Sequence, residues 1–201
     1  MQTAEFADCI GRRESIAGIP PVQALMPRRI EASTPNLYSG QFGCGAFPFH
    51  TDLAHWFLPP RFILLRCRRG DARVFTSVLP WDRAIRGLPT SVMSRARFRP
   101  RRALNGRVHL LPFAQVVGDT ALWRWDSVFL EPDNHEAAAL ADHLMQMGST
   151  GERVVLRDPG DTLVIDNWRV MHARSAVPTG ARRRLVERSY LRELGNDGQS
   201  D

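Results

Sequence analysis

Three side chains of the kind that bind transition metals lie in two short segments far apart in the sequence. The first segment is Phe49-His50-Thr51-Asp52, and the second ends at His172. A histidine and an aspartate two residues apart on an extended segment point to the same side. A second histidine from a distant strand would then complete one triangular face of an octahedron, with three adjacent positions open. That geometry suits an Fe(II) ion that must hold a chelating co-substrate and dioxygen together.

The order and context of these residues matter more than their types. With 6 histidines and 21 acidic residues in the chain, roughly 0.6 His-x-acid pairs are expected by chance, so His50 and Asp52 alone decide little. For His172 taken alone, a buried imidazole bonded to a backbone carbonyl group is the favoured interpretation. His55, three residues after Asp52, would compete with His172 as a ligand. Its place beside Trp56 and just before two prolines favours a pocket wall or a structural role instead.

Two arginines follow the distal histidine. Arg184 and Arg188 lie four residues apart, a spacing that puts both side chains on one face of a strand. If that face points into a barrel, a buried guanidinium group needs an anionic or hydrogen-bonding partner. A substrate carboxylate is the partner expected for Arg188, and an internal salt bridge to Asp126 or Asp166 is the alternative.

These segments together resemble the taurine dioxygenase and clavaminate synthase superfamily of Fe(II)/2-oxoglutarate-dependent oxygenases. The resemblance runs from about Ser39 to Arg192, and it includes the strand-turn context of the distal histidine in Asp166–His172. Three further stretches fit more loosely: Pro59–Leu65, Arg124–Asp126 and Pro159–Asp161.

The resemblance implies that His50, Asp52 and His172 are the catalytic Fe(II) ligands. It further implies that Arg184 binds the distal carboxylate of 2-oxoglutarate and that Arg188 faces the substrate. The run of arginines at 182–184 leaves this register open, so that Arg183 or Arg188 could bind 2-oxoglutarate instead. The threonine that helps to hold 2-oxoglutarate in the family has no counterpart in Gly70–Arg73.

The implied reaction is oxidation, with dioxygen, of a small carboxylate-bearing metabolite such as an amino acid or a biosynthetic intermediate. Hydroxylation is favoured because Asp52 is present, whereas related halogenating enzymes lack the carboxylate ligand. Two alternatives stay open: a catalytically silent jelly-roll protein that binds metal or ligand, and a zinc-dependent hydrolase that uses the same triad. Relatives are usually longer, which leaves open a homo-oligomer in which another subunit supplies the lid of the substrate pocket.

Composition excludes several other classes. All 27 basic residues are arginine, so a phosphate-loop NTPase, a pyridoxal-phosphate Schiff base and a lysine general base are ruled out. The three cysteines, Cys9, Cys44 and Cys67, suit neither a disulfide framework nor a zinc ribbon and predict a reduced, cytoplasmic setting. The amino terminus does not resemble a signal peptide. The apolar runs are too short to span a bilayer, so no membrane association is expected.

The arginine-rich stretch 95–107 has more than one interpretation. Arg95, Arg97, Arg99 and Arg101 alternate with other residues, so a strand would present them on one face. A charged strand that contains proline is typical of a sheet edge, and this is the favoured interpretation. A lid over an anionic substrate is the second, and nucleic acid is the least favoured partner.

Many short apolar or β-branched runs with turns between them predict a mainly β protein, a double-stranded β-helix (jelly roll) with a few flanking helices. One clear helix is expected over 137–147, capped by Asp133. The chain is expected to be a single oxygenase domain over residues 1–201. Within it, 1–38 would be an irregular N-terminal segment, 39–192 the jelly-roll core and 193–201 a flexible tail.

Overall fold

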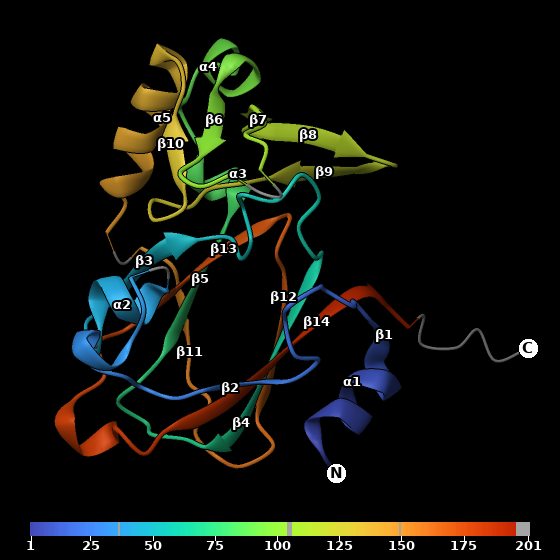
Figure 1. Ribbon diagram of the computed structural model, residues 1–201, viewed down its shortest axis with the longest axis vertical. Helices are drawn as coiled ribbons and strands as arrows, with labels where there is room; N and C mark the ends of the chain where they lie inside the picture. Colours follow the sequence, from blue (N-terminus) through green and yellow to red (C-terminus); the bar gives the residue numbers. More distant parts are fainter. Residues whose placement is uncertain (36, 104–105, 149, 196–201) are drawn as a thin grey trace, which may run out of the picture.

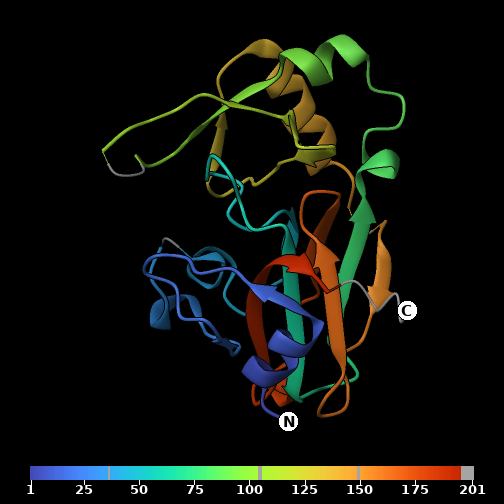
Figure 2. The same ribbon diagram turned by 90° about the vertical axis from the view of Figure 1, so that its right-hand side faces the viewer.

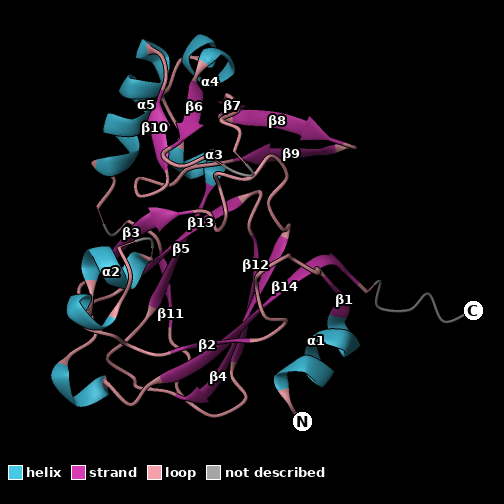
Figure 3. Cartoon of the chain, viewed as in Figure 1, coloured by secondary structure: helices cyan, strands magenta, loops and turns pink. Residues whose placement is uncertain are grey.

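Two antiparallel sheets form the body of the molecule (Figure 1), and the computed structural model describes residues 1–35, 37–103, 106–148 and 150–195. The first sheet has the order β1 (Gly11–Arg13), β14 (Leu185–Leu194), β4 (Phe62–Arg69) and β12 (Thr162–Asp166). The second has the order β11 (Glu152–Val154), β5 (Thr76–Pro80), β13 (Val170–Arg174) and β3 (Phe47–His50). Side chains from both sheets line one cavity. The jelly-roll prediction is confirmed, and strands dominate over helices (Figure 3).

A second layer, built from the middle of the chain, covers one end of this body (Figure 2). It contains helices α3 (Trp81–Ala84), α4 (Thr90–Arg95) and α5 (His135–Met145) and a sheet of order β10 (Leu130–Pro132), β6 (Arg97–Pro100) and β7 (Leu111–Pro112). The hairpin of β8 (Ala114–Val117) and β9 (Thr120–Trp123) projects from it. Its core is aromatic: Phe98, Phe113 and Trp125 are almost fully buried.

The expected edge position of the arginine-rich strand is wrong. β6 lies between β10 and β7, paired on both sides. Phe98 and Pro100 are buried while Arg99 and Arg101 are exposed, and both arginines contact Glu131 on β10, at 3.1 and 2.5 Å. The alternation therefore reflects one solvated face of a central strand, because the neighbouring strands come from segments whose pairing the local pattern does not encode.

The predicted helix exists, but its cap differs. Asn134, rather than Asp133, is the capping residue, since its Oδ1 accepts a hydrogen bond from the Ala137 N–H at 3.0 Å. The same amide group also accepts from the Arg97 N–H and donates to the Arg95 carbonyl oxygen. The Asn134 side chain therefore both caps helix α5 and joins its start to the backbone at the start of β6.

The N-terminal segment is not irregular throughout, as the sequence had suggested. Helix α1 (Thr3–Ile10) packs Ala7 against Leu64 and Leu191 of the first sheet. Strand β2 (Gln23–Leu25) pairs with β14, and the 3-10 turn η1 (Ile30–Ala32) and helix α2 (Tyr38–Phe42) follow. Contacts with the first sheet hold this segment in place. The sequence did not predict its helix because the apolar pattern is too short.

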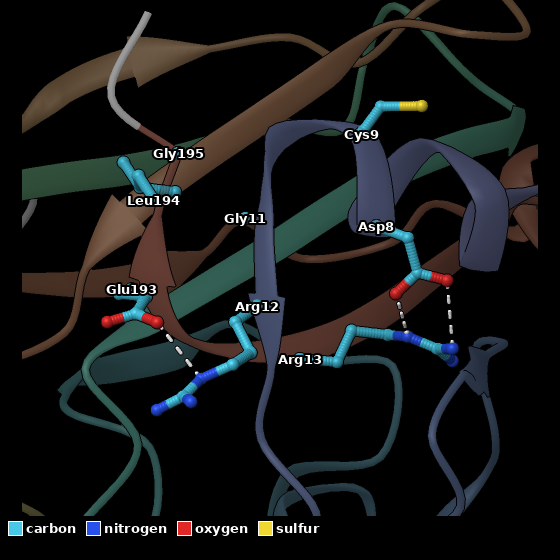
Figure 4. Close-up of a pocket in the computed structure, with 8 residues that line it drawn as sticks. All are labelled: Asp8, Cys9, Gly11, Arg12, Arg13, Glu193, Leu194 and Gly195. Atoms are coloured by element: carbon cyan, nitrogen blue, oxygen red, sulfur yellow. Dashed lines mark hydrogen bonds and ion pairs between the residues drawn. The ribbon is translucent and has the colours of Figure 1, made fainter.

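The expected tail also begins later than residue 193. β14 continues to Leu194 and pairs with β1, and Arg12 contacts Glu193 at 3.0 Å across a shallow surface pocket (Figure 4). Arg13 and Asp8 form a second ion pair on the other side of this pocket. Residues 196–201 of the predicted tail lie outside the described residues. Within the part of the chain that the structure describes, no helix is both long and apolar enough to cross a membrane.

Candidate metal centre and its cavity

The structure brings His50, Asp52 and His172 together. His50 ends β3 and lies opposite His172 of β13 in the antiparallel register. One ligand atom from each of the three residues lies within 4.8 Å of the others. Asp52 Oδ1 is 3.5 Å from Nε2 of both histidines, and all three side chains are buried. Two imidazole nitrogens and one carboxylate oxygen therefore converge from one side, as the spacing predicts.

The backbone around Asp52 is held by residues from two other segments. Asp52 N–H donates to Asn167 Oδ1 at 2.7 Å, and Asn167 Nδ2 donates to the Asp52 carbonyl oxygen at 3.0 Å. Thr51 N–H donates to the carbonyl oxygen of Trp125 at 2.8 Å. Leu53, which follows Asp52, has a φ of 54° and is the one non-glycine residue with positive φ in the described chain. Such backbone costs about 1–3 kcal/mol and persists where its surroundings impose it.

The outer atoms of His50 and Asp52 are also held by hydrogen bonds. His50 Nδ1 lies 2.8 Å from the Pro48 carbonyl oxygen, so this nitrogen carries the proton and the lone pair of Nε2 faces the other two side chains. Asp52 Oδ2 accepts hydrogen bonds from Arg188 Nη1 at 2.7 Å and from the Tyr190 hydroxyl at 2.9 Å. A divalent transition metal fits this donor set, because one nitrogen of each imidazole and one carboxylate oxygen converge, although His172 Nδ1 has no hydrogen-bond partner among the described residues.

Charge supports the same assignment. Burial alone would raise the pKa of the Asp52 carboxyl group, but Arg188 and the two histidines outweigh burial and hold that pKa well below its ordinary value. Burial and the neighbouring His50 lower the pKa of His172. Asp52 is therefore ionised and His172 neutral near pH 7, the protonation states that bind a metal. Burial would lower the pKa of His50, but its contact with Asp52 outweighs burial and raises that pKa, so a bound metal would have to displace a proton from His50 more often than from His172.

The three side chains open onto a cavity of about 860 Å³. Arg184 lies in its wall, immediately before β14, and is 7% exposed. Its Nε atom has no hydrogen-bond partner among the described residues, and burial lowers the pKa of the guanidinium group. A buried, unsatisfied cation that faces a cavity is suited to receive an anion.

Arg188 differs from Arg184 in having partners. Its Nη1 atom binds Asp52, while Nε and Nη2 both donate to Gln23 Oε1 of β2, at 2.8 and 2.6 Å. The alternative salt bridge to Asp126 or Asp166 is not formed: Asp126 Oδ1 accepts backbone N–H groups, and Asp166 pairs with an arginine of the loop before β4. Asp52 was not predicted as the partner of Arg188, because its carboxylate was expected to bind the metal.

Part of the cavity lining is aromatic. Tyr38 stacks on His50 with ring centroids 4.2 Å apart, and Phe129 lies beside His55 at 5.1 Å. His55 is in this part of the cavity wall, as predicted, and is not part of the group that could hold a metal. Burial lowers the pKa of His55 to about 4, so it is neutral near pH 7. Asp126 contributes a buried carboxylate to the same wall, and burial raises its pKa.

Several residues of the site escaped sequence reasoning. Thr76 and Arg174, opposite each other in the β5–β13 register, line the cavity near Arg184. The segment Gly70–Arg73 contains no threonine, but strand β5 begins three residues later, at Thr76. Gln23 and Tyr190 reach Arg188 and Asp52 from segments without a metal-binding pattern. The alternation along β14 does put Tyr190 on the same face as Arg184 and Arg188, but it gives no sign of the hydrogen bond from Tyr190 to Asp52.

Arg124 is a further residue whose role only the structure reveals. It is fully buried, and its guanidinium group donates to the carbonyl oxygens of Ala54, Trp56 and Phe57, at 2.6 to 3.2 Å. These carbonyls belong to the loop that follows Asp52. Arg124 thus fixes the backbone of the loop that follows the candidate ligand Asp52.

Comparison with known proteins agrees with this geometry. The family described as "Taurine catabolism dioxygenase TauD, TfdA family" matches residues 100–190. Clavaminate synthase 2 of Streptomyces clavuligerus is 29% identical over 165 residues, which cover 72% of this chain and 49% of that protein. The chain is thus similar in sequence to members of the taurine dioxygenase and clavaminate synthase superfamily. It spans about half the length of the relatives it matches.

Solved structures of the superfamily share the fold. An asparagine oxygenase in complex with Fe(II), 2S,3S-3-hydroxyasparagine and succinate aligns with a TM-score of 0.67 at 21% identity, over 85% of this chain and 56% of that one. The non-heme iron oxygenase OrfP, in complex with Fe, succinate and (3S)-hydroxy-L-Arg, aligns with a TM-score of 0.64 at 22% identity, again over 85% and 56%. At these identities the likeness shows that this chain shares their jelly-roll fold, and no more.

Proposed function

We propose that this protein is an Fe(II)- and 2-oxoglutarate-dependent oxygenase that hydroxylates a small carboxylate-bearing metabolite, such as an amino acid. The observation that carries the proposal is the buried convergence of His50, Asp52 and His172 on a cavity lined also by Arg184, whose Nε atom has no hydrogen-bond partner among the described residues. Asparagine oxygenase and OrfP, whose structures hold hydroxylated amino acids, support the choice of substrate class.

In this proposal His50, Asp52 and His172 hold the iron. When bound, Fe(II) supplies the activation of dioxygen, and 2-oxoglutarate is oxidised to succinate and carbon dioxide while one oxygen atom enters the substrate. Two neutral imidazoles and one carboxylate leave a net charge of +1 on the ion, which favours an anionic co-substrate. The burial of all three side chains strengthens this attraction, because water screens it little.

Arg184 is proposed to bind the far carboxylate of 2-oxoglutarate. The planar guanidinium fork can donate two parallel hydrogen bonds to a carboxylate, which an ammonium group cannot. Arg174, held by the carbonyl oxygens of Gly43 and Gly45, adds a second positive charge to this part of the cavity. The hydroxyl group of Thr76 is a further donor on the same wall.

Arg188 is proposed as the substrate-side residue. Its Nε and Nη2 atoms form the side of the fork that suits a carboxylate, and Gln23 Oε1 occupies them in the structure. A substrate carboxylate would take the place of the Gln23 oxygen while Nη1 keeps Asp52. The aromatic wall with Tyr38 and Phe129 would pack on the rest of the substrate.

The test is the anaerobic addition of Fe(II), followed by 2-oxoglutarate, to the metal-free protein. A visible charge-transfer band should appear only when both are present, and it should be absent in His172→Ala. Failure of the band in the wild-type protein would contradict the proposal. Succinate release then separates the alternatives, since a silent metal-binding protein would show the band without turnover. A zinc hydrolase would retain zinc and release no succinate. An oxygen electrode would measure the proposed consumption of dioxygen. We further propose that the protein forms a homo-oligomer, which size-exclusion chromatography would test, and that it functions in the cytoplasm.

A further inference from the structure

The two carboxylate oxygens of Asp52 have different surroundings. Oδ1 lies 3.5 Å from both histidine Nε2 atoms. Oδ2 accepts two hydrogen bonds, from Arg188 Nη1 at 2.7 Å and from the Tyr190 hydroxyl at 2.9 Å. Both donors come from β14, two residues apart on one face of the strand. The carboxylate is thus divided into one free oxygen and one occupied oxygen.

This division has a consequence for coordination. A carboxylate can bind a metal ion through one oxygen or through both. With two donors on Oδ2, one of them charged, rotation of that oxygen toward the ion would break both hydrogen bonds in a buried place. Leaving a buried donor unsatisfied is unfavourable for a neutral group and more so for a charged one. The observed arrangement therefore favours coordination through Oδ1 alone.

A purely structural explanation would be that Asp52 is a buried charge that needs a cation. Arg188 meets that need by itself, so this explanation does not require Tyr190. Tyr190 is nonetheless 4% exposed, and Asp52 Oδ2 accepts its hydroxyl hydrogen bond. A tyrosine hydroxyl is ordinarily protonated near neutral pH, so Tyr190 can donate this hydrogen bond.

Arg188 itself is kept in place from the opposite side. Gln23 Oε1 accepts from Nε and Nη2, and the pairing of β2 with β14 places Gln23 directly opposite Arg188. The guanidinium plane is therefore set before any ligand arrives. We propose that Arg188 and Tyr190 are positioning residues, a carboxylate clamp that holds Asp52 as a one-oxygen metal ligand and so keeps one coordination position open for the co-substrate. This inference rests on the function proposed above.

The experiment uses Co(II) as the probe metal with the full chain, because its visible spectrum reports the number and arrangement of its ligands. Metal-free wild type, Tyr190→Phe, Arg188→Lys and the control Arg192→Lys are titrated with Co(II). Arg192 lies on the same strand but makes an exposed ion pair with Glu14. Tyr190→Phe removes one oxygen atom only, so it decides the question even where Arg188→Lys does not fold.

The expected result is a Co(II) affinity about tenfold weaker in Tyr190→Phe, as is usual when a partner of a ligand is removed, together with a changed spectrum at saturation. Arg192→Lys should match the wild type in both. An unchanged saturated spectrum in Tyr190→Phe, with or without weaker binding, would overturn the clamp and leave a structural role. If wild type binds no Co(II), or His172→Ala binds it equally well, the proposed function itself fails and the clamp with it.

Discussion

Asn167 binds the backbone of Asp52 at both its N–H and its carbonyl group, at 2.7 and 3.0 Å. The same side chain donates to the Pro60 carbonyl oxygen at 3.0 Å, and all of Asn167 is buried. One amide thereby connects the turn after β12 to the loop after β3. The two metal-binding segments, distant in sequence, are joined by this residue as well as by the pairing of β3 with β13.

Asn167→Asp should therefore weaken both the fold and the metal centre. The aspartate keeps an acceptor for the Asp52 N–H group but cannot donate to the Asp52 and Pro60 carbonyl oxygens. Loss of two buried donors should lower the free energy of unfolding by about 2–4 kcal/mol, measured by urea denaturation of the metal-free protein. Metal affinity, measured by titration, should fall as well. Wild-type values of both quantities would show that Asn167 does not hold this loop.

Metal content should separate the ligands from the wall histidine. His50→Ala, Asp52→Ala and His172→Ala are each expected to lose tightly bound Fe(II), because the remaining two side chains cannot replace the missing donor. His55→Ala should retain it, since His55 lies outside the group. Elemental analysis after desalting measures the outcome, and circular dichroism checks the fold. Metal retained by His172→Ala and lost by His55→Ala would reverse the assignment.

Arg184→Lys should weaken 2-oxoglutarate binding without weakening Fe(II) binding. Truncating one partner of a buried charge-assisted pair costs about 2–5 kcal/mol, and an ammonium group cannot reproduce the two-point contact. Calorimetric titration of the metal-loaded protein under anaerobic conditions measures the change. Arg183→Lys is the matched control, because Arg183 is exposed while its neighbour is buried. A defect in the control alone would shift the register of the co-substrate residue.

Gln23→Glu should compete with the substrate. The new carboxylate would form an ion pair with the Nε and Nη2 atoms of Arg188, where Gln23 now places a neutral oxygen. We expect the KM for carboxylated substrates to rise by about tenfold or more, since charged pairs bind more strongly than neutral ones. Succinate formation across a panel of amino acids measures the change.

Two comparisons complete the Gln23 test. Gln23→Ala should leave the fork open and should raise KM far less than Gln23→Glu, because it adds no competing charge. Esterified substrates should lose their stimulation of succinate formation in the wild-type protein. Equal turnover of acid and ester would show that Arg188 does not recognise a substrate carboxylate.

Local geometry explains what could be predicted from sequence. His50 and Asp52 point the same way because side chains alternate along extended backbone, and Arg184 and Arg188 reach the same cavity for the same reason. The short apolar runs predict strands by their period, and those strands form the two sheets. These features depend on residues close in sequence, whose relative directions the covalent chain dictates.

The tertiary structure alone decided which distant groups meet. Sequence placed Arg188 near Asp126 or Asp166, but the register of β14 against β4 and β2 brings it to Asp52 and Gln23. Strand β6 is central rather than an edge strand because distant segments, β10 and β7, pair with it on both sides. Which segments pair is determined by the sum of many small packing and hydrogen-bond energies over the whole chain, and no local period records that sum.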